Sequence, residues 1–468
     1  MNKNFYITTP IYYANDIPHI GHTGTTVYAD IAARYKRALG FDVLFLTGTD
    51  EHGEKIATTA LKNGKEPQPF VDELVVKWKQ YWETLNISND VFMRTTMPEH
   101  KAIAQELLTK LYDKGDIYKA LYKGIYCVGC EEFKSEKDLV DGKCPEHRPD
   151  QVSYREEENY FFKLSKYIPQ VKKYMEDGTL PVVPENKKNE MLARLNDEIK
   201  DSSVSRSNLT WGVQIPWDKT QVTYVWIEAL MNYYTATRIW HKEDFWPADV
   251  HFLGKGNNWF HSVIWPALLL ALDLPLPKKV FVHGYYNVEG KKMGKSLGNV
   301  ISPQELMDRY GVDGTRYLLA ASMPYENDSD VSWTWFDQKY NSGLANGLGN
   351  LSSRLKKMVE GLDLNFIEPH VANIFEKSIE IKTAYEDLKF NQVIELLSQK
   401  ISKVDEYLSE TTPWKKEGAE KAQILEKSVN ELLEIALLIS PITPTTSDKI
   451  IKGFLTNRPI EALFPRIK

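Results

Sequence analysis

The alternation of strand and helix at the start of the chain constrains the fold more than any other feature of the sequence. Residues 5–9 form a short β-prone run that ends at a proline, and residues 28–39 carry apolar side chains at helical spacing. Residues 41–47 are nearly all apolar, which is typical of a strand buried on both faces of a parallel sheet. Strand, helix and strand so close together form a βαβ unit. The sequence therefore predicts an α/β fold with a doubly wound, Rossmann-like parallel sheet.

Changes in composition divide the 468 residues into four expected segments, as the length leads one to expect for more than one core. Residues 1–116 and 224–334 carry the α/β pattern and are expected to be two halves of one domain. Residues 117–223 are rich in charge, Tyr, Gly and Pro and are expected to be an insertion. Residues 335–468 lose the strand pattern, and apolar stripes at 344–358, 384–408 and 432–439 predict an α-helical bundle.

The overall charge and hydrophobicity exclude several classes of protein. The net charge of −6 opposes binding to DNA or RNA mainly through counterion release, so any RNA contact is expected to be local. No apolar run approaches the roughly 20 residues that span a bilayer, and the first residues lack a secretory pattern. We therefore expect a cytoplasmic protein with no membrane partner and no DNA partner.

All three cysteines of the chain lie within one short segment of the expected insertion. Cys127 and Cys130 form a Cys-x-x-Cys pair, and Cys144 and His147 form a Cys-x-x-His pair. Two knuckles with this spacing can close one tetrahedral site, which predicts a single structural Zn²⁺ ion. The alternative is three buried thiols and a surface histidine, whereas an odd number of cysteines opposes a disulfide framework.

A Pro-His-Ile-Gly-His sequence at residues 18–22 falls between the first predicted strand and the first predicted helix. Free backbone amides at a helix start favour phosphate oxygens there. Gly21 allows a nucleotide to lie against the backbone, and His19 and His22 can donate hydrogen bonds to an α-phosphate during in-line attack. Taken alone, the pair can also be two surface histidines in a turn.

A second motif, Lys-Met-Gly-Lys-Ser at residues 292–296, lies in a segment that is rich in glycine and lysine. A flexible loop that closes the ammonium groups of Lys292 and Lys295 over a triphosphate suits a reaction that releases pyrophosphate. The spacing is not that of a Walker A loop, and a solvated basic turn is the alternative.

Together the two motifs resemble the double signature of class I aminoacyl-tRNA synthetases, with Gly294 where that family usually has serine. Residues 8–15 (TTPIYYAN), 48–53 (GTDEHG) and 224–233 (YVWIEALMNY) are similar to the methionine-specific family. The resemblance implies ATP-dependent activation of L-methionine to the adenylate, with Mg²⁺ accompanying ATP, and transfer to the 3′ end of tRNA(Met). It assigns transition-state stabilisation to the two histidines and pyrophosphate stabilisation to the two lysines.

The resemblance also implies the residues of each pocket. The methionine pocket would be lined by Ile11, Tyr13, Trp226, Leu230, Tyr233, Phe260 and His261, with Asp50 paired to the substrate ammonium group. The ATP site would include Gly21, Gly254, Asn257, His283 and Gly284, together with Lys292 and Lys295. The chain departs from the family at Gly256, where relatives carry an aspartate that holds the ribose. We suggest Asn257 or a water for that contact.

Polar residues of the predicted bundle point to RNA recognition. Asn346, Asn350 and Arg354 recur every four residues away from the leucine stripe, which places them on one helix edge suited to reading splayed bases. By resemblance, Asn350, Arg354 and Trp414 match residues that recognise the anticodon, with Trp414 stacking on a base. The alternative is a solvated helix face and an ordinary surface tryptophan. With no additional dimerising module, we expect a monomer.

Three other functions remain open at this point. A class I synthetase for another apolar amino acid would share both motifs but differ in the pocket segments. A nucleotidyltransferase with the same histidine pair would not need the helical bundle. A catalytically silent tRNA-binding relative is expected to have lost His22 or Lys295, and this chain keeps both.

Overall fold

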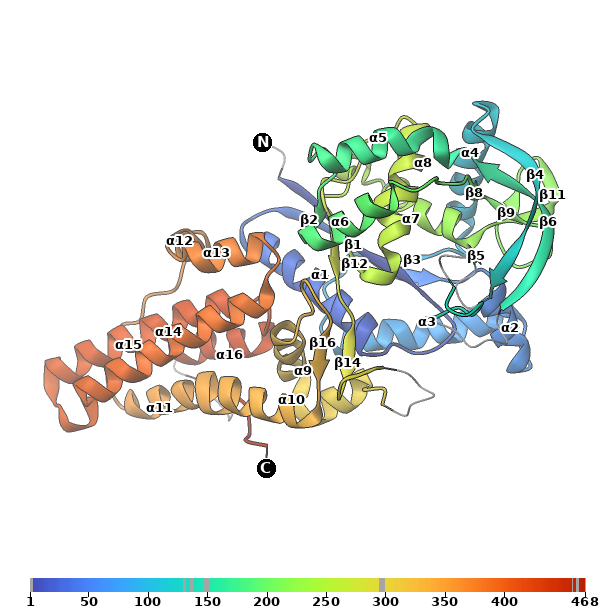
Figure 1. Ribbon diagram of the computed structural model, residues 1–468. Helices are drawn as coiled ribbons and strands as arrows, with labels where there is room; N and C mark the ends of the chain where they lie inside the picture. The colour runs from blue at the N-terminus through green and yellow to red at the C-terminus, as the bar shows by residue number, and fades with distance from the viewer. Residues whose placement is uncertain are drawn as a thin grey trace.

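The computed structural model describes residues 3–128, 132–134, 139–145, 152–293, 299–456, 458–459 and 463–467. An α/β region with a six-stranded parallel sheet forms one end of the molecule, and a helical region extends away from it (Figure 1). The strand order of this sheet is β3-β2-β1-β12-β13-β7. The α/β class and the helical region predicted from the sequence are confirmed.

The predicted βαβ unit is formed by β1 (Asn4–Tyr13), α1 (Ile20–Ala38) and β2 (Asp42–Asp50). The helix was expected at 28–39 but begins eight residues earlier. Its first two turns contain glycines and threonines, which are weak helix formers and hid the pattern. Capping at His19 and burial against the sheet override that weak propensity.

The remaining strands of the parallel sheet come from distant parts of the chain. On one side β2 pairs with β3 (Val91–Arg94), and on the other β1 pairs with β12 (Val250–Gly254) and β12 with β13 (Val280–His283). The edge strand β7 (Val182–Val183) comes from within the expected insertion. The helices between the first strands are α2 (Glu54–Lys62), α3 (Pro67–Thr84) and α4 (Pro98–Asp113).

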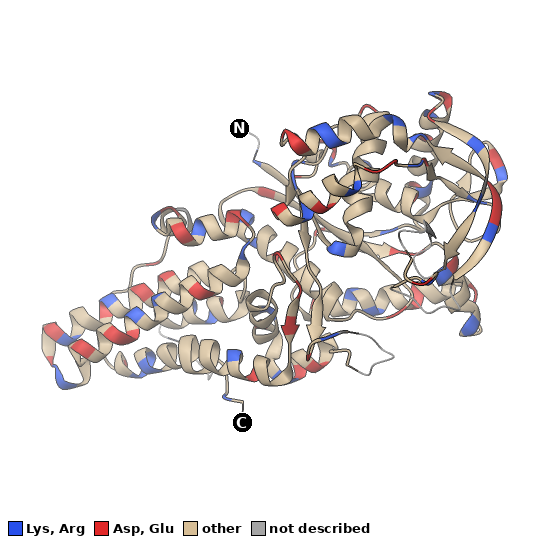
Figure 2. Cartoon of the chain, viewed as in Figure 1, with Lys and Arg blue, Asp and Glu red and all other residues tan. Residues whose placement is uncertain are grey.

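The segment expected to be an insertion contains a long antiparallel ribbon of β4 (Ile117–Cys127) and β6 (Val152–Phe162). Figure 2 shows basic and acidic residues side by side along it, and the ion pair of Lys123 with Glu156 joins directly opposite positions at 2.8 Å. Its other elements are β5 (Glu132–Lys134), α5 (Leu164–Glu176), α6 (Glu185–Arg194), β8 (Ser202–Ser203), β9 (Ser205–Arg206), β10 (Gln214–Ile215) and β11 (Asp218–Thr223).

After residue 223 the chain returns to the main sheet and then forms a small second sheet. The order of that sheet is β15-β14-β16. The elements are α7 (Val225–Ile239), two 3₁₀ turns (Glu243–Phe245 and Lys255–Asn257), a short π-helix (Phe260–Ile264), α8 (Trp265–Ala271), β14 (Tyr286–Val288), β15 (Lys291–Lys292), α9 (Pro303–Ala321) and β16 (Ser329–Val331).

The helical region differs from the sequence prediction at two places. The stripe expected at 384–408 is broken at Leu388, whose positive φ of 61° ends one helix and turns the chain into the next. The stripe expected at 344–358 begins with a π-helix around Gly347, which is wider than an α-helix. The elements are α10 (Trp333–Tyr340), the π-helix (Asn341–Gly349), α11 (Asn350–Met358), α12 (Val371–Lys377), α13 (Ile379–Glu386), α14 (Phe390–Thr411), a 3₁₀ turn (Pro413–Lys415), α15 (Gly418–Ile439) and α16 (Pro444–Leu455).

One apolar core runs from one face of the main sheet through α1 and α9 into the helical region. A second core covers the opposite sheet face with α4, α5, α7 and α8. The two regions therefore share buried surface. Among the described residues, none of the helices has the length and apolar composition needed to span a membrane.

Candidate active site

The predicted site residues gather at the carboxyl ends of the central strands. The strand order reverses between β1 and β12, because β2 and β3 lie on one side of this pair while β13 and β7 lie on the other. In open α/β sheets, ligands bind outside the carboxyl ends of the strands at such a switch point. The histidine motif follows β1 directly, and Asp50 ends β2 opposite Tyr13 of β1.

His19 and His22 cap the first turn of α1. The Nδ1 atom of His19 accepts a hydrogen bond from the amide of Gly21 at 3.0 Å, and the Nδ1 atom of His22 accepts one from the amide of His19 at 3.4 Å. The two rings stack with centroids 3.7 Å apart. Because each Nδ1 is an acceptor, a neutral ring carries its proton on Nε2. The pair therefore offers two N–H donors at a helix N-terminus.

Both histidines are held in the neutral form. The pKa of His19 is lowered to about 4, mainly by burial, and the positive charge of Lys55 contributes to this shift. Burial also lowers the pKa of His22 well below its usual value, with smaller contributions from His19 and Lys55. Near pH 7 the pair can stabilise an anion by hydrogen bonding but carries no charge of its own.

Lys55 brings the positive charge that the histidines lack. This residue lies in the first turn of α2, and its ammonium group sits 5.1 Å from the centre of the Tyr13 ring. Its positive charge contributes to the lowered pKa of both histidines. The sequence does not single out this residue, because one lysine at a helix start forms no pattern. Its position two residues after the GTDEHG segment was the available signal.

The residues between Asp50 and Lys55 are each tied to a different element. Buried Glu51 accepts a bidentate pair of hydrogen bonds from Arg94 of β3 at 2.7 and 2.9 Å. Glu54 makes a bidentate pair with Arg155 of β6 at 2.9 and 3.0 Å. These contacts hold the turn that carries Asp50 and Lys55 against β3 and against β6 at once.

His52, in the same turn, belongs to a buried polar cluster. Its Nδ1 atom lies 2.7 Å from one carboxylate oxygen of Glu228 on α7, and Nε2 of His100 on α4 lies 2.9 Å from the other. All three side chains are at most 1% exposed. Burial alone would raise the pKa of Glu228, but the two histidines outweigh it and lower the pKa to about 2. The turn is thereby linked to α7, two residues beyond Trp226.

Aromatic side chains form the wall of the predicted methionine pocket. Trp226 of α7 stacks on Phe260 with ring centroids 4.0 Å apart and planes inclined by only 8°. Tyr13 of β1 meets the edge of Trp226 at 6.0 Å. The structure thus brings together three predicted residues from three distant segments. Aromatic rings suit a thioether, which is polarisable and favours ring contacts.

A second set of predicted pocket residues is joined by hydrogen bonds. The hydroxyl group of Tyr233 donates to Nε2 of His261 at 2.6 Å, while Nδ1–H of His261 donates to the carbonyl of Asn257 at 2.9 Å. Burial lowers the pKa of His261 to about 4, so the ring is neutral. Leu230, also on α7, is buried in the same core, and Ile11 is partly buried against it.

Comparison with known proteins gives one consistent result. The family model described as tRNA synthetases class I (M) matches residues 5–153 and 150–356. The methionine--tRNA ligase of Caldanaerobacter subterraneus subsp. tengcongensis is 44% identical over 97% of this chain and 74% of its own length. The chain belongs to the methionine--tRNA ligases. The same protein from Nostoc sp. is 40% identical over 97% of this chain and 91% of its own length.

Solved structures of the family have the same fold. The structure of Mycobacterium tuberculosis methionyl-tRNA synthetase in complex with methionyl-adenylate has a TM-score of 0.91 and 32% sequence identity to this chain. The similarity covers 99% of this chain and 100% of that one. The α/β region and the helical region are therefore both shared with a methionine--tRNA ligase.

On the nucleotide side, His283 ends β13 beside the start of α1. Its Nδ1–H donates to the carbonyl of Gly284 at 2.7 Å, and its Nε2 lies 2.7 Å from the hydroxyl group of Thr25. Burial lowers its pKa to about 4. A β-carbon at Gly284 would lie 2.6 Å from the carbonyl oxygen of Asn327, so that position requires glycine. Gly254 ends β12 next to this segment.

The place left by the missing ribose aspartate is occupied by another side chain. A β-carbon built on Gly256 would lie 2.0 Å from the hydroxyl oxygen of Tyr285. Lys255 lies 4.9 Å from the Tyr285 ring centre and pairs with Asp328 at 2.8 Å. The carbonyl of Asn257 is already bonded to His261. Tyr285, which belongs to no motif in the sequence, is thus a second candidate for the ribose contact beside the Asn257 side chain.

Several predicted site residues lie next to the described residues' boundaries or outside the described residues. Lys292 pairs through its backbone with β14, whereas Gly294 and Lys295 lie outside the described residues. Cys130 and His147 lie outside them as well. Cys127 and Cys144 are both buried, and Cys127 is the last residue of β4, opposite Val152. Within the described part of the chain, no group of three or more His, Cys, Asp or Glu side chains is arranged so that it could hold a metal ion.

The predicted RNA-contacting residues lie in the helical region. Asn350 is exposed at the start of α11, and Trp414 is 52% exposed in the short turn between α14 and α15. Arg354 is partly exposed and forms an ion pair of 2.6 Å with Asp405 of α14. Both signs of charge occur along α14 and α15 (Figure 2), which fits a local RNA contact better than a basic surface.

Proposed function

We propose that this member of the methionine--tRNA ligases activates L-methionine with ATP and transfers the methionyl group to tRNA(Met). The observation that carries the proposal is the neutral histidine pair at the N-terminus of α1, which the neighbouring residues Tyr12 and Tyr13 of β1 connect to the Trp226–Phe260 wall and to Asp50. In this arrangement an amino acid with an apolar side chain is held next to a phosphate-binding helix start.

In the first step, a carboxylate oxygen of methionine attacks the α-phosphorus of ATP, and the bond to the bridging oxygen of the β-phosphate breaks. Asp50 would pair with the substrate ammonium group. The Nε2–H groups of His19 and His22 would donate to the oxygens on which negative charge grows. Lys55, with Lys292 and Lys295, would stabilise the departing pyrophosphate, and Mg²⁺ would accompany it.

In the second step, a hydroxyl group at the 3′ end of tRNA(Met) attacks the carbonyl carbon of the adenylate, and AMP leaves. We assign this chemistry to residues 1–116 and 224–334, with 117–223 as an insertion and 335–468 as the anticodon-binding region. Asn350, Arg354 and Trp414 would read the anticodon. We further propose a monomer in the cytoplasm.

One structural Zn²⁺ ion would be held by Cys127, Cys130, Cys144 and His147. The buried position of the two described cysteines, at the end of β4 and in the excursion between β4 and β6, fits three thiolates and an imidazole closing that excursion. Metal analysis should find about one zinc per chain, and Cys144→Ser should lose it. A zinc-free wild-type chain with full charging activity would remove the metal from the proposal.

Exchange of labelled pyrophosphate into ATP, tested with each of the twenty amino acids, examines the proposed function directly. We expect a signal with methionine alone and its loss in His19→Ala, His22→Ala and Asp50→Ala. Thr58, exposed on α2, supplies the control variant Thr58→Ala. A signal with another apolar amino acid would keep the class and reject the pocket, whereas silence of folded protein would favour a catalytically silent tRNA-binding relative.

A further inference from the structure

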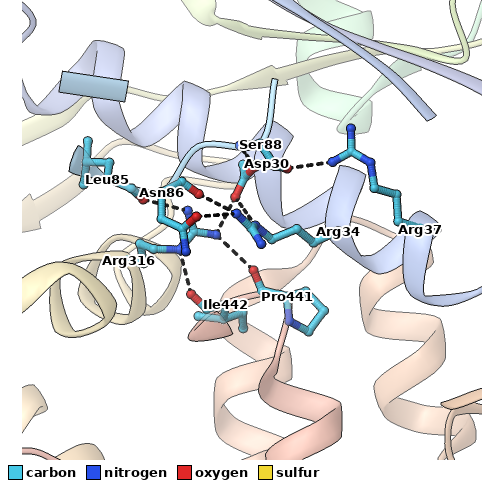
Figure 3. A network of polar contacts seen from close by, with 9 residues as sticks. All are labelled: Asp30, Arg34, Arg37, Leu85, Asn86, Ser88, Arg316, Pro441 and Ile442. Atoms are coloured by element: carbon cyan, nitrogen blue, oxygen red, sulfur yellow. Dashed lines mark hydrogen bonds and ion pairs between the residues drawn. The ribbon is translucent and has the colours of Figure 1, made fainter. Parts of the chain in front are cut away.

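Arg316 of α9 is a fully buried arginine that joins segments far apart in the sequence (Figure 3). Its guanidinium group donates to the carboxylate of Asp30 on α1 at 2.6 Å and to the carbonyl of Leu85 at 3.3 Å. It also donates to the carbonyls of Pro441 and Ile442 at 3.0 and 2.9 Å. The planar fork of arginine suits this role because it presents five donors in fixed directions.

Asp30, at the other end of this ion pair, is also held by several hydrogen bonds. Its carboxylate also accepts from the amide and the hydroxyl group of Ser88, at 2.7 and 2.6 Å, and from Arg34 at 2.7 Å. Burial opposes ionisation, but Arg316 and Arg34 outweigh it and hold the pKa of Asp30 below its usual value. Asp30 lies on the same helix as the histidine pair, so the network holds in place α1, the helix that begins at the candidate active site.

The Pro441–Ile442 end belongs to the helical region. These two residues form the turn between α15 and α16, and their carbonyls are acceptors at a helix end. A second contact lies beside it, since the carboxylate of Asp313 on α9 accepts from the amide of Thr446 on α16 at 2.6 Å. Because α9 follows the lysine motif in the chain, α9 links both nucleotide motifs to this turn.

The Pro441–Ile442 turn, which accepts hydrogen bonds from Arg316, follows the C-terminal end of a long helix. Trp414 lies just before the N-terminal end of the same helix. Helix α15 has 22 residues and begins four residues after Trp414. At 1.5 Å per residue it spans about 33 Å, so a tilt of about 10° at the turn would move the Trp414 end by about 6 Å. Small changes at the Arg316 contacts therefore become large at the proposed anticodon end.

We propose that Arg316 is a positioning residue that sets the orientation of the helical region relative to the adenylate-forming site, so that one tRNA can reach both. The inference rests on the proposed function, because it assumes that the helical region holds the anticodon. Displacing a bound reactant by about 1 Å can cost about 100-fold in rate. Arg316 therefore matters for transfer to tRNA and not for activation of methionine.

The test replaces Arg316 by lysine, which keeps a positive charge beside Asp30 but cannot reach three carbonyls at once. Three quantities are measured: methionine-dependent pyrophosphate exchange, binding of an anticodon stem–loop oligonucleotide, and charging of full-length tRNA(Met). We expect exchange and stem–loop binding within about 2-fold of wild type and charging reduced by about 10- to 100-fold. Arg309→Lys is the matched control, because Arg309 lies on the same helix in an exposed ion pair with Asp337.

A second variant guards against misfolding of Arg316→Lys. Asp313→Ala removes the neighbouring contact to α16 without leaving an unpaired charge, and the shared apolar core should keep the two regions folded together. Selective loss of charging in either variant supports the proposal. Charging at the wild-type level in both variants, or a parallel loss of all three activities, overturns it. A wild-type chain without exchange would instead reject the proposed function.

Discussion

At the scale of single residues, the histidine pair separates two tasks. His19 and His22 are neutral and supply directed N–H donors, while the positive charge that acts on both of them comes from Lys55. A permanently charged pair would bind ATP and pyrophosphate with similar strength and slow product release. Neutral donors at a helix N-terminus favour the transition state through geometry instead.

Replacement of Lys55 by methionine tests the charge assigned to it. Methionine keeps much of the side-chain length, but a hydrogen bond to a charged group contributes about 1.5–3 kcal/mol. We expect kcat/KM for pyrophosphate exchange to fall by about 10- to 100-fold and the pKa of His19, read by NMR, to rise. Lys62→Met, at the exposed end of the same helix, is the control. Unchanged exchange would remove Lys55 from the site.

Two substitutions identify the ribose contact near Gly256. If the Tyr285 hydroxyl binds the ribose, Tyr285→Phe should raise KM for ATP by about 3- to 10-fold, since a neutral hydrogen bond contributes about 0.5–1.5 kcal/mol. KM for methionine should not change. Asn257→Ala is the paired variant: an effect there, with Tyr285→Phe silent, would return the contact to Asn257.

Buried neutral histidines make stability depend on pH. The pKa of His261 is about 4 in the folded chain and about 6.5 when unfolded. Between these values the unfolded chain binds the proton, so stability falls as the pH falls from about 6.5 to about 4. At pH 4.5 this histidine alone costs about 2.5 kcal/mol relative to neutral pH. Urea unfolding of His261→Gln should show that much less acid sensitivity than wild type. An equal change in the exposed His370→Gln would contradict the assignment.

At the scale of elements, the turn of residues 50–55 after β2 is the junction of the site. Its side chains reach β3, α7 and β6, so Lys55 and Asp50, the carboxylate proposed to bind the substrate ammonium group, are positioned by three neighbours. The link to α7 through His52 and Glu228 also sets the turn against Trp226. The geometry of the amino-acid pocket therefore depends on polar contacts behind it.

Glu228→Gln tests this link. The carboxylate accepts from two histidines, whereas an amide would present its N–H₂ group to one of them and displace it. We expect KM for methionine to rise by about 10-fold with KM for ATP unchanged, and a loss of stability of about 1–3 kcal/mol. The two KM values from exchange assays separate the outcomes. A loss confined to stability would leave the cluster a purely structural role.

At the scale of the whole molecule, the sequence predicted the architecture better than the contacts. The fold followed from the βαβ pattern and the bundle from its apolar stripes, because burial leaves a period in the sequence. The break at Leu388 and the early start of α1 were missed, since tertiary packing decided both. Arg316 was missed for another reason: a buried ion pair between positions 30 and 316 has no local signature.

Substitution of Trp414, the exposed tryptophan between α14 and α15, tests whether the helical region binds RNA. Stacking of a base on an aromatic ring contributes about 1–3 kcal/mol, so Trp414→Ala should raise KM for tRNA(Met) by about 5- to 150-fold. Pyrophosphate exchange should be unchanged, because the length of α15 lies between the turn that contains Trp414 and the Pro441–Ile442 turn that contacts α9. Trp414→Phe keeps a ring and should restore most of the affinity. If alanine and phenylalanine behave alike, the ring does not stack. An equal fall in exchange would mean that this end supports folding and not recognition.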